Sequence, residues 1–133
     1  MSRLHNLLAQ IDRQGDSSCL DLVGAEITDA IMPYLLDHIR KKHYAFQIIK
    51  LVKNNISDEG LRSLLSYLSS DRTTQVLNLT SNHLTQHSLD WIICFAEVNE
   101  ILRTFYLSNN KISSFHLKTK KKESTALGLE LII

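Results

Sequence analysis

The chain has 133 residues, a formal net charge of +1 and an apolar fraction of 44%. This length and composition suit a single folded domain over residues 1–133 and argue against disorder of the whole chain. A charge so close to neutral gives no general attraction for nucleic acid or an anionic membrane, so the sequence predicts neither as a partner.

The first predicted element is an amphipathic helix over residues 2–14. Its apolar positions follow the i, i+3, i+4, i+7 spacing of a helix: Leu4, Leu7, Leu8 and Ile11. Gly15 stands where such a helix would end. The start of the chain lacks the apolar run of a secretory signal, and no segment approaches bilayer-spanning length. We interpret residues 1–16 as an N-terminal cap on the units that follow.

A pattern then recurs four times at intervals of 29, 28 and 28 residues. Its anchors are Leu22, Leu51, Leu79 and Leu107. Each anchor closes a short segment with apolar residues on one side, as in a strand. Three residues past the anchors come Ala25, Asn54, Asn82 and Asn110. A period of this kind predicts a solenoid of stacked units and not a globule with one closed core.

Each of the first three turns leads into a segment with helical apolar spacing. The apolar positions are Ile31, Met32, Leu35, Leu36 and Ile39, then Leu61, Leu64, Leu65 and Leu68, then Leu89, Ile92, Ile93 and Ala96. Thr28 or Asp29, Ser57 and Thr85 are the expected helix caps, and Pro33 falls near a first turn, where it costs least. We therefore assign repeats to residues 17–45, 46–73, 74–101 and 102–126.

The fourth unit departs from the pattern. After Ile112 a basic run, Lys118–Lys122, takes the place of an amphipathic stripe, so any helix here is expected to be short or frayed. Residues 127–133 alternate like a closing strand, with Leu129 at an early spacing of 22 from Leu107. An apolar strand with nothing after it exposes a sheet edge, which predicts self-association through the terminal strand.

These units match the pattern LxxLxLxxNxL followed by a helical half, most fully at residues 46–61. The pattern resembles the leucine-rich repeat family over residues 17–112, and the period of 28 to 29 with a full helix is similar to its ribonuclease-inhibitor-like type. The resemblance implies an α/β fold: a short leucine-rich repeat solenoid with a parallel sheet on the concave face, helices on the convex face and an N-terminal capping helix.

The recurring asparagines are predicted to be structural. An amide side chain both donates and accepts, so Asn54, Asn82 and Asn110 can satisfy backbone groups that each turn leaves unpaired. A single catalytic or ligand site would not recur at the repeat period. Ala25 replaces the asparagine in the first unit, so that turn should be less well tied.

Strand residues that alternate with the inward ones should face the concave surface. They form three columns: Cys19, Ile48, Val76 and Thr104; Asp21, Lys50, Asn78 and Tyr106; and Val23, Val52, Thr80 and Ser108. The centre column changes chemistry at every unit. We therefore predict a partner-binding surface made of Asp21, Lys50, Val52, Asn78, Thr80, Tyr106 and Ser108, with Lys50 and Tyr106 as the main anchors. The alternative is that Val and Ile here are simply good strand formers.

No catalytic residue, metal site or cofactor is predicted. His83 and His87 have i, i+4 spacing but no third ligand, and Cys94 beside Phe95 is interpreted as a core thiol. Cys19 and Cys94 are expected to be free thiols, which predicts a cytoplasmic location. The basic run is either a solvated loop or a nuclear-import or anionic-surface segment.

The predicted function is a non-enzymatic module that binds a protein partner through its concave face. The resemblance also implies an alternative, a GTPase-activating protein, which would need an arginine or asparagine presented at a turn. Helices or return loops hold the candidate arginines: Arg40, Arg62, Arg72 and Arg103. A regulatory or effector-type protein, as a truncated form of a longer array, is a further alternative.

Overall fold

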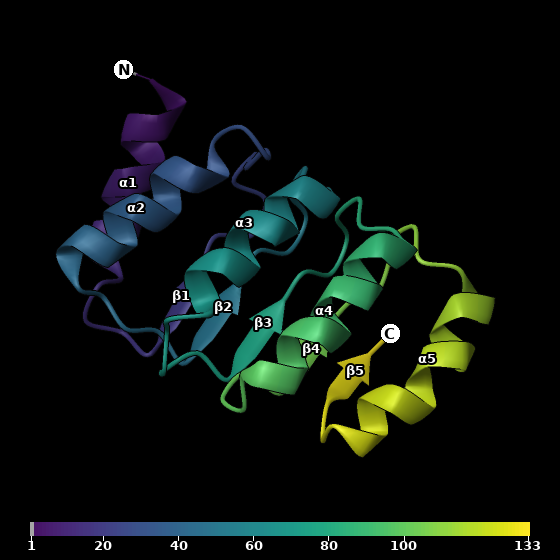
Figure 1. Cartoon of the computed structure of the whole chain (residues 1–133). Coiled ribbons are helices and arrows are strands. Elements are labelled where there is room, and N and C mark those ends of the chain that lie inside the picture. The colour runs from purple at the N-terminus through teal and green to yellow at the C-terminus, as the bar shows by residue number, and fades with distance from the viewer. Residues whose placement is uncertain (1) are drawn as a thin grey trace.

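The computed structural model describes residues 2–133, so Met1, the first residue of the predicted cap, lies outside it. Helices and strands alternate along the described chain (Figure 1). The helices are α1 Arg3–Arg13, α2 Met32–Lys42, α3 Asp58–Leu68, α4 Gln86–Val98 and α5 Ser114–Ala126. The strands are β1 Cys19–Asp21, β2 Ile48–Lys50, β3 Val76–Asn78, β4 Thr104–Tyr106 and β5 Glu130–Ile132.

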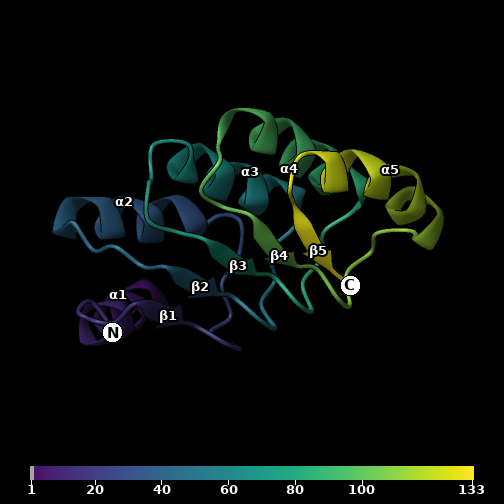
Figure 2. The same ribbon diagram turned by 90° about the horizontal axis from the view of Figure 1, so that it is seen from below.

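The strands form one parallel sheet in chain order, and α2 to α5 cover one of its faces (Figure 2). Each unit is therefore a strand followed by a helix that runs back over the sheet, which is the predicted α/β solenoid. The core lies between the two layers, where the middle residue of each of the first four strands is buried in register: Leu20, Ile49, Leu77 and Phe105.

The register of β5 corrects the predicted last spacing. Leu131 pairs with Phe105 and Glu130 with Thr104, so the interval is 26 residues and not the 22 obtained by matching Leu129 to Leu107. The difference arises because a full helix precedes β5. The chain then turns at Gly128, where φ is +76°, a backbone conformation that suits glycine.

An asparagine side chain joins each pair of neighbouring turns. Asn54 Oδ1 accepts from the N–H groups of Ala25 and Ile27 at 3.1 and 2.9 Å, and its Nδ2 donates to the carbonyls of Leu22 and Leu51 at 3.0 and 2.9 Å. Asn82 and Asn110 repeat this arrangement one and two units further along. Each amide thus bonds the backbone of its own unit and of the preceding one.

The residue before each of these asparagines has a left-handed backbone, and so does Gly24 before Ala25. The φ angles of Gly24, Lys53, Ser81 and Asn109 lie between 55° and 61°. For a residue other than glycine this conformation costs about 1 kcal/mol. The amide hydrogen bonds offset that cost, because the turn is what presents the backbone N–H and C=O groups to the asparagine.

Carboxylates at the helix starts form a second link between units. Asp58 of α3 accepts from the Thr85 N–H at 2.8 Å and from the hydroxyls of Thr85 and Ser88 at 2.5 Å each. Asp29 likewise accepts from the N–H and hydroxyl of Ser57 in the next unit. Burial raises the pKa of Asp58, but the Ser88 and Thr85 hydrogen bonds outweigh it and leave the pKa below its ordinary value of 3.8.

Of the three predicted helix caps, one is confirmed and two are wrong. Thr85 caps α4 as expected, since its hydroxyl oxygen accepts from the His87 N–H at 3.3 Å. Ser57 precedes α3, but its hydroxyl donates to Asp29 instead of accepting from the helix. Neither Thr28 nor Asp29 caps α2, which begins after Ile31 without a side-chain cap, because the Asp29 carboxylate is already bound to the next unit.

The helix α1 closes the first end of the solenoid and buries Leu7 and Ile11. Asp12 Oδ1 accepts from the Tyr44 hydroxyl at 2.7 Å and lies 2.8 Å from His38 Nε2. The Tyr44 hydrogen bond, followed by that of His38, lowers the pKa of the Asp12 carboxyl. A polar cluster therefore fixes α1 to α2 and to the loop after it.

The prediction of a short or frayed fourth helix is wrong, because α5 spans 13 residues. Its ends explain this: the Ser113 hydroxyl accepts from the His116 N–H at 3.1 Å, and at the other end the Leu129 N–H donates to the Ser124 carbonyl at 2.9 Å. Lysines are also good helix formers. Only Ser124 of this helix is fully buried, and half-buried Leu117 is the one apolar residue of the helix that packs against the core.

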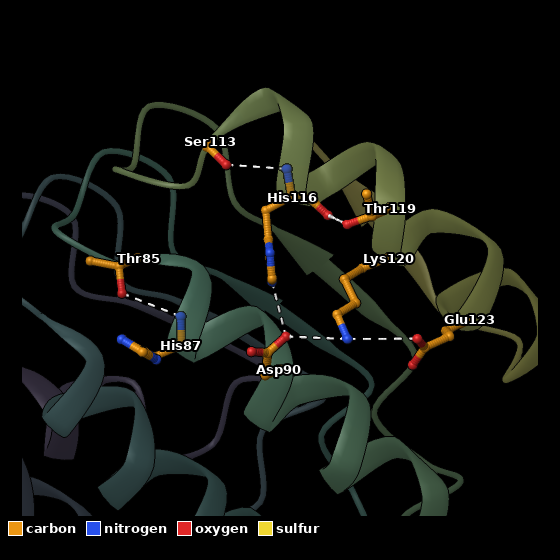
Figure 3. A network of polar contacts seen from close by, with 8 residues as sticks. All are labelled: Thr85, His87, Asp90, Ser113, His116, Thr119, Lys120 and Glu123. Atoms are coloured by element: carbon orange, nitrogen blue, oxygen red, sulfur yellow. Dashed lines mark hydrogen bonds and ion pairs between the residues drawn. The ribbon is translucent and has the colours of Figure 1, made fainter.

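Polar contacts with α4 also hold α5 (Figure 3). Asp90 Oδ1 lies 2.9 Å from His116 Nε2 and 3.6 Å from Lys120 Nζ, and Lys120 Nζ lies 3.6 Å from Glu123 Oε1. One carboxylate of α4 therefore contacts two successive turns of α5.

Replacement of Asn54 by alanine should lower the free energy of unfolding by about 3 kcal/mol, because buried backbone groups of two units lose their partners. Asn55→Ala is the matched control: its amide is exposed and its loss should cost at most about 0.5 kcal/mol. Urea denaturation of both variants measures the difference, and equal losses would contradict the role given to Asn54.

The contribution of Asp58 to stability should depend on acid pH. Because its folded pKa lies below 3.8, the stabilisation is fully present above that pH and is lost as the pH falls through the folded pKa. Asp58→Asn should therefore destabilise the protein at neutral pH, and its deficit relative to the wild type should shrink on acidification. Thermal melts over a pH series test this, with exposed Glu59→Gln as a control whose deficit should stay small at every pH.

Replacement of Asp90 by alanine should make the amide hydrogens of α5 exchange about fivefold faster, since a half-exposed ion pair contributes about 1 kcal/mol. Asp37→Ala, which removes the exposed Asp37–Lys41 pair on α2, should leave α5 unchanged. Hydrogen exchange followed by mass spectrometry resolves the helix. Unchanged exchange in the Asp90 variant would mean that other contacts hold α5.

Candidate functional site

The face of the sheet away from α2 to α5 carries the three predicted columns in register. The centre column places Asp21, Lys50, Asn78 and Tyr106 side by side across β1 to β4. The first column, Cys19, Ile48, Val76 and Thr104, lies beside it. The third column follows the strands, where the N–H groups next to Val23, Val52, Thr80 and Ser108 continue the ladder of hydrogen bonds.

The strand β5 extends this surface beyond the predicted residues. Ile132 joins the centre column opposite Tyr106, and Glu130 joins the first column opposite Thr104. The sequence signal for both is the alternation in residues 127–133, which places them on the face opposite Leu131. The predicted alignment of Leu129 with Leu107 placed Glu130 and Ile132 out of register with the columns, so the sequence analysis did not include them.

Local hydrogen bonds fix part of the centre column. Asn78 Oδ1 accepts from the N–H and hydroxyl of Thr80 at 3.1 and 2.7 Å, so these two predicted side chains orient each other. Asp21 Oδ1 accepts from the Val23 N–H at 3.2 Å. The polar atoms of these side chains therefore have fixed directions on the surface.

Lys50 and Tyr106 differ from these residues. Among the hydrogen bonds and ion pairs of residues 2–133, none involves Lys50 Nζ or the Tyr106 hydroxyl. Both side chains are half-buried, so their stems are packed while their polar ends remain available. The hydroxyls of Thr104 and Ser108 on this face also lack a partner within the described chain, but Lys50 and Tyr106 are the largest side chains whose donors are free in this way.

A glutamine that the sequence analysis did not single out closes the first edge of the sheet. Gln14 Oε1 accepts from the Asp21 N–H at 2.7 Å, and Gln14 Nε2 donates to the Asp21 carbonyl at 3.0 Å. A carboxamide presents one acceptor and one donor, as a neighbouring strand residue does. No periodic signal marks Gln14, because it lies outside the repeats.

The structure corrects the interpretation of Cys94 as a core thiol. Its side chain is exposed on α4, while its neighbours Ile93 and Phe95 are buried. The helical period places Cys94 on the outer face, beside Trp91 and close to Arg62 of α3, whose guanidinium carbon lies 5.6 Å from the Trp91 ring centre. Cys19 is half-buried, and neither thiol forms a disulfide.

Other candidate chemistry does not assemble into a site. His83 Nε2 lies 3.3 Å from Asn55 Oδ1, and within residues 2–133 no three histidine, cysteine or acidic side chains gather around a point where a metal ion could bind. In the same part of the chain, none of the helices has the length and apolar character needed to cross a membrane.

Comparison with known proteins identifies the repeat. Residues 46–65 match the family model described as "Leucine Rich repeat". These residues run from the loop before β2 into α3, and so contain one strand, its turn with Asn54 and the start of a helix. No curated protein compared with the chain is detectably similar to it in sequence.

Solved structures resemble the whole fold. A structure titled "Leiomodin-1 Actin-Binding Site 2 (ABS2)" has a TM-score of 0.73 at 16% identity and covers 98% of this chain and 76% of its own. The Chaetomium structure titled "Mex67:Mtr2 subunits" has a TM-score of 0.65 at 19% identity and covers 96% and 88%. At these identities the likeness shows the fold alone, and the ribonuclease-inhibitor-like type stays a prediction.

Proposed function

We propose that this leucine-rich repeat chain is a non-enzymatic interaction module that binds a protein partner through the concave face of its sheet. The observation that carries the proposal is the centre column. Its residues lie in one register but differ in chemistry, from acid to base to amide to phenol. The buried column on the opposite face of the same strands is uniformly apolar, as packing requires.

Lys50 and Tyr106 are the proposed anchors. A tyrosine contributes a large apolar ring and a hydroxyl donor with little loss of conformational freedom, which is why it often dominates protein interfaces. An ammonium group with no partner in its own chain can pair with a carboxylate of another. Between them, Asn78 and Thr80 present oriented polar atoms that favour one docking geometry.

The area available suggests a small interface. Five parallel strands at the usual spacing span about 20 Å, and each strand is three residues long. A surface of this size corresponds to the lower end of stable protein interfaces. Val52 and Ser108, on the third column, belong to the proposed surface and would form part of its rim.

No specific observation favours the GTPase-activating alternative. Arg103 donates to the backbone carbonyls of Ala96, Asn99 and Leu127, and Arg40 lies over the Tyr67 ring at 5.6 Å. An arginine held in this way does not extend from a turn toward a nucleotide. The regulatory or effector-type alternative likewise has no residue that supports it over a general binding role.

Proteins of the same fold support the class of partner. One is titled an actin-binding site, and the other is a structure of two subunits together. Because the likeness is one of fold, actin itself is not proposed as the partner here. The free thiols of Cys19 and Cys94 are compatible with the cytoplasmic location that the sequence predicts, and that location remains a proposal.

The concave-face proposal predicts that Lys50→Glu with Tyr106→Ala lowers partner recovery to about one tenth or less, since two anchors together contribute well over 1.4 kcal/mol. The measurement is affinity purification with quantitative mass spectrometry. The matched control is Lys122→Glu with Tyr34→Ala, the same exchanges at exposed positions of α5 and α2.

The control variant should recover the same partners as the wild type. A folded Lys50→Glu, Tyr106→Ala variant that also recovers them in full would refute binding through this face. Thermal melts of both variants establish that each is folded.

A further inference from the structure

The outward backbone groups of the two edge strands, β1 and β5, differ in their hydrogen bonding. At β1, the Gln14 carboxamide bonds the outward N–H and C=O of Asp21. At β5, the N–H of Glu130 donates to Arg103 and the carbonyl of Ile132 accepts from Leu107, so these two residues face β4. Because backbone groups alternate in direction along a strand, the N–H and C=O of Leu131 point away from β4, and no backbone group of residues 2–133 bonds them there.

A cleft of about 540 Å³ lies beside this edge, between β5 and α5. One wall is a stripe of α5 that includes Leu117, Lys118 and Lys121, and the other includes Leu129 and Leu131. In the earlier units the next strand and helix cover the corresponding space. Here Leu117 and Leu131 are only half-buried, and the adjoining Ile133 is 58% exposed.

The cleft combines apolar and basic surfaces. Within residues 2–133, no carboxylate lies within ion-pair distance of Lys118 or Lys121, whereas Lys120 on the other side of the helix is paired with Asp90 and Glu123. Glu130 also borders the cleft, although its position in β5 alternates with that of Leu131. Two lysines and one glutamate therefore border the cleft, and neither lysine has a carboxylate partner among residues 2–133.

We infer that this end of the solenoid binds an extended segment of a partner protein, which pairs with the open edge of β5 and places apolar and acidic side chains in the cleft beside α5. The free N–H and C=O of Leu131 select an extended backbone, as in strand addition to a sheet edge. The apolar walls accept one face of that strand. Lys118 and Lys121 select carboxylates on the same face.

A second copy of this chain fits the edge less well. Two β5 strands paired about a twofold axis would bring two α5 helices together on the same side of a continuous sheet. Each helix carries four lysines, Lys118, Lys120, Lys121 and Lys122, and one acidic residue, Glu123. Like charges would then meet across the axis, which disfavours the self-association expected from the sequence.

The first experiment is a selection from phage-displayed random peptides of about ten residues, long enough to pair along β5 and fill the cleft. Enriched peptides should carry both apolar and acidic residues at every second position, so that these side chains share one face of the extended strand. The absence of any enriched peptide, or enrichment of basic peptides, would overturn the inference. The most enriched peptide, made synthetically with a fluorescent label, is then the probe for fluorescence anisotropy.

Two neighbouring lysines give a matched pair of variants for this probe. Lys121→Glu, in the cleft, should weaken peptide binding about tenfold or more, because a charge-assisted contact becomes a repulsion. Lys122→Glu makes the same change of charge on the next residue, outside the cleft, and should change affinity less than about twofold. Equal effects of the two variants would contradict an oriented acidic ligand.

A second pair of variants separates the contribution of the Leu131 backbone N–H from that of the Leu131 side chain. Leu131→Pro removes the outward N–H while leaving the bonds of Glu130 and Ile132 to β4, and it should abolish peptide binding. Leu131→Ala shortens the side chain but keeps the N–H, so it should retain weakened binding. Thermal melts check both folds, and if the proline variant does not fold, the lysine pair still decides the question.

Two further measurements distinguish this surface from the others. The Lys50→Glu, Tyr106→Ala variant should bind the peptide as the wild type does, so failure of the concave-face proposal leaves this one testable. Sedimentation at rising concentration should find a monomer. A dimer that is lost in Leu131→Pro would identify a second copy as the occupant and overturn the peptide inference.

Discussion

The hydrogen bonds of one amide side chain per turn hold the units of this solenoid in a common register. Asn54 bonds backbone groups of the first and second units, and Asn82 and Asn110 do the same for the next pairs. The backbone ladder of the three-residue strands continues into the turns, and these side chains add a second set of polar links between units there. The positions of all surface columns follow from that register.

The same link sets the shape of the proposed binding face. Because the amide accepts from one unit and donates to two, a shift of one strand along its neighbour would leave several buried groups unpaired. The Asp29–Ser57 and Asp58–Thr85 contacts oppose such a shift at the helix starts. Lys50 and Tyr106 are therefore held in one register on the same face, with Asn78 between them, although neither takes part in holding that register.

The sequence predicts what recurs. The anchors and the column positions appear at a fixed period in four units and the asparagines in three, and the register of β1 to β4 agrees with that period. Features that occur once are missed. The helix α5 has no apolar stripe and is specified by Ser113, by the turn at Gly128 and by Asp90 on another helix. Gln14 and the β5 register have no repeated counterpart either.

Some errors came from treating neighbours in sequence as neighbours in space. Cys94 stands in an apolar run, which suggested burial, but α4 buries Ile92, Ile93, Phe95 and Ala96 and so turns Cys94 outward. Ser57 has the residue type of a cap, yet the carboxylate of Asp29, 28 positions earlier, binds its hydroxyl. For Cys94 the helical period of α4 decides the orientation, whereas for Ser57 the deciding partner lies one unit away, at a distance that local patterns do not cover.

The attachment of α5 connects the helix layer to the open end of the sheet. One wall of the terminal cleft belongs to this helix, which has a single buried residue and depends on Asp90 of α4 for two of its contacts. Polar contacts of His116 and Lys120, on the opposite side of α5, therefore help to position this wall. A ligand in the cleft would pack against Leu117 and add to the apolar contacts of α5. Binding there would therefore strengthen the attachment of α5 as well as extend the sheet, because the same helix forms one wall of the cleft.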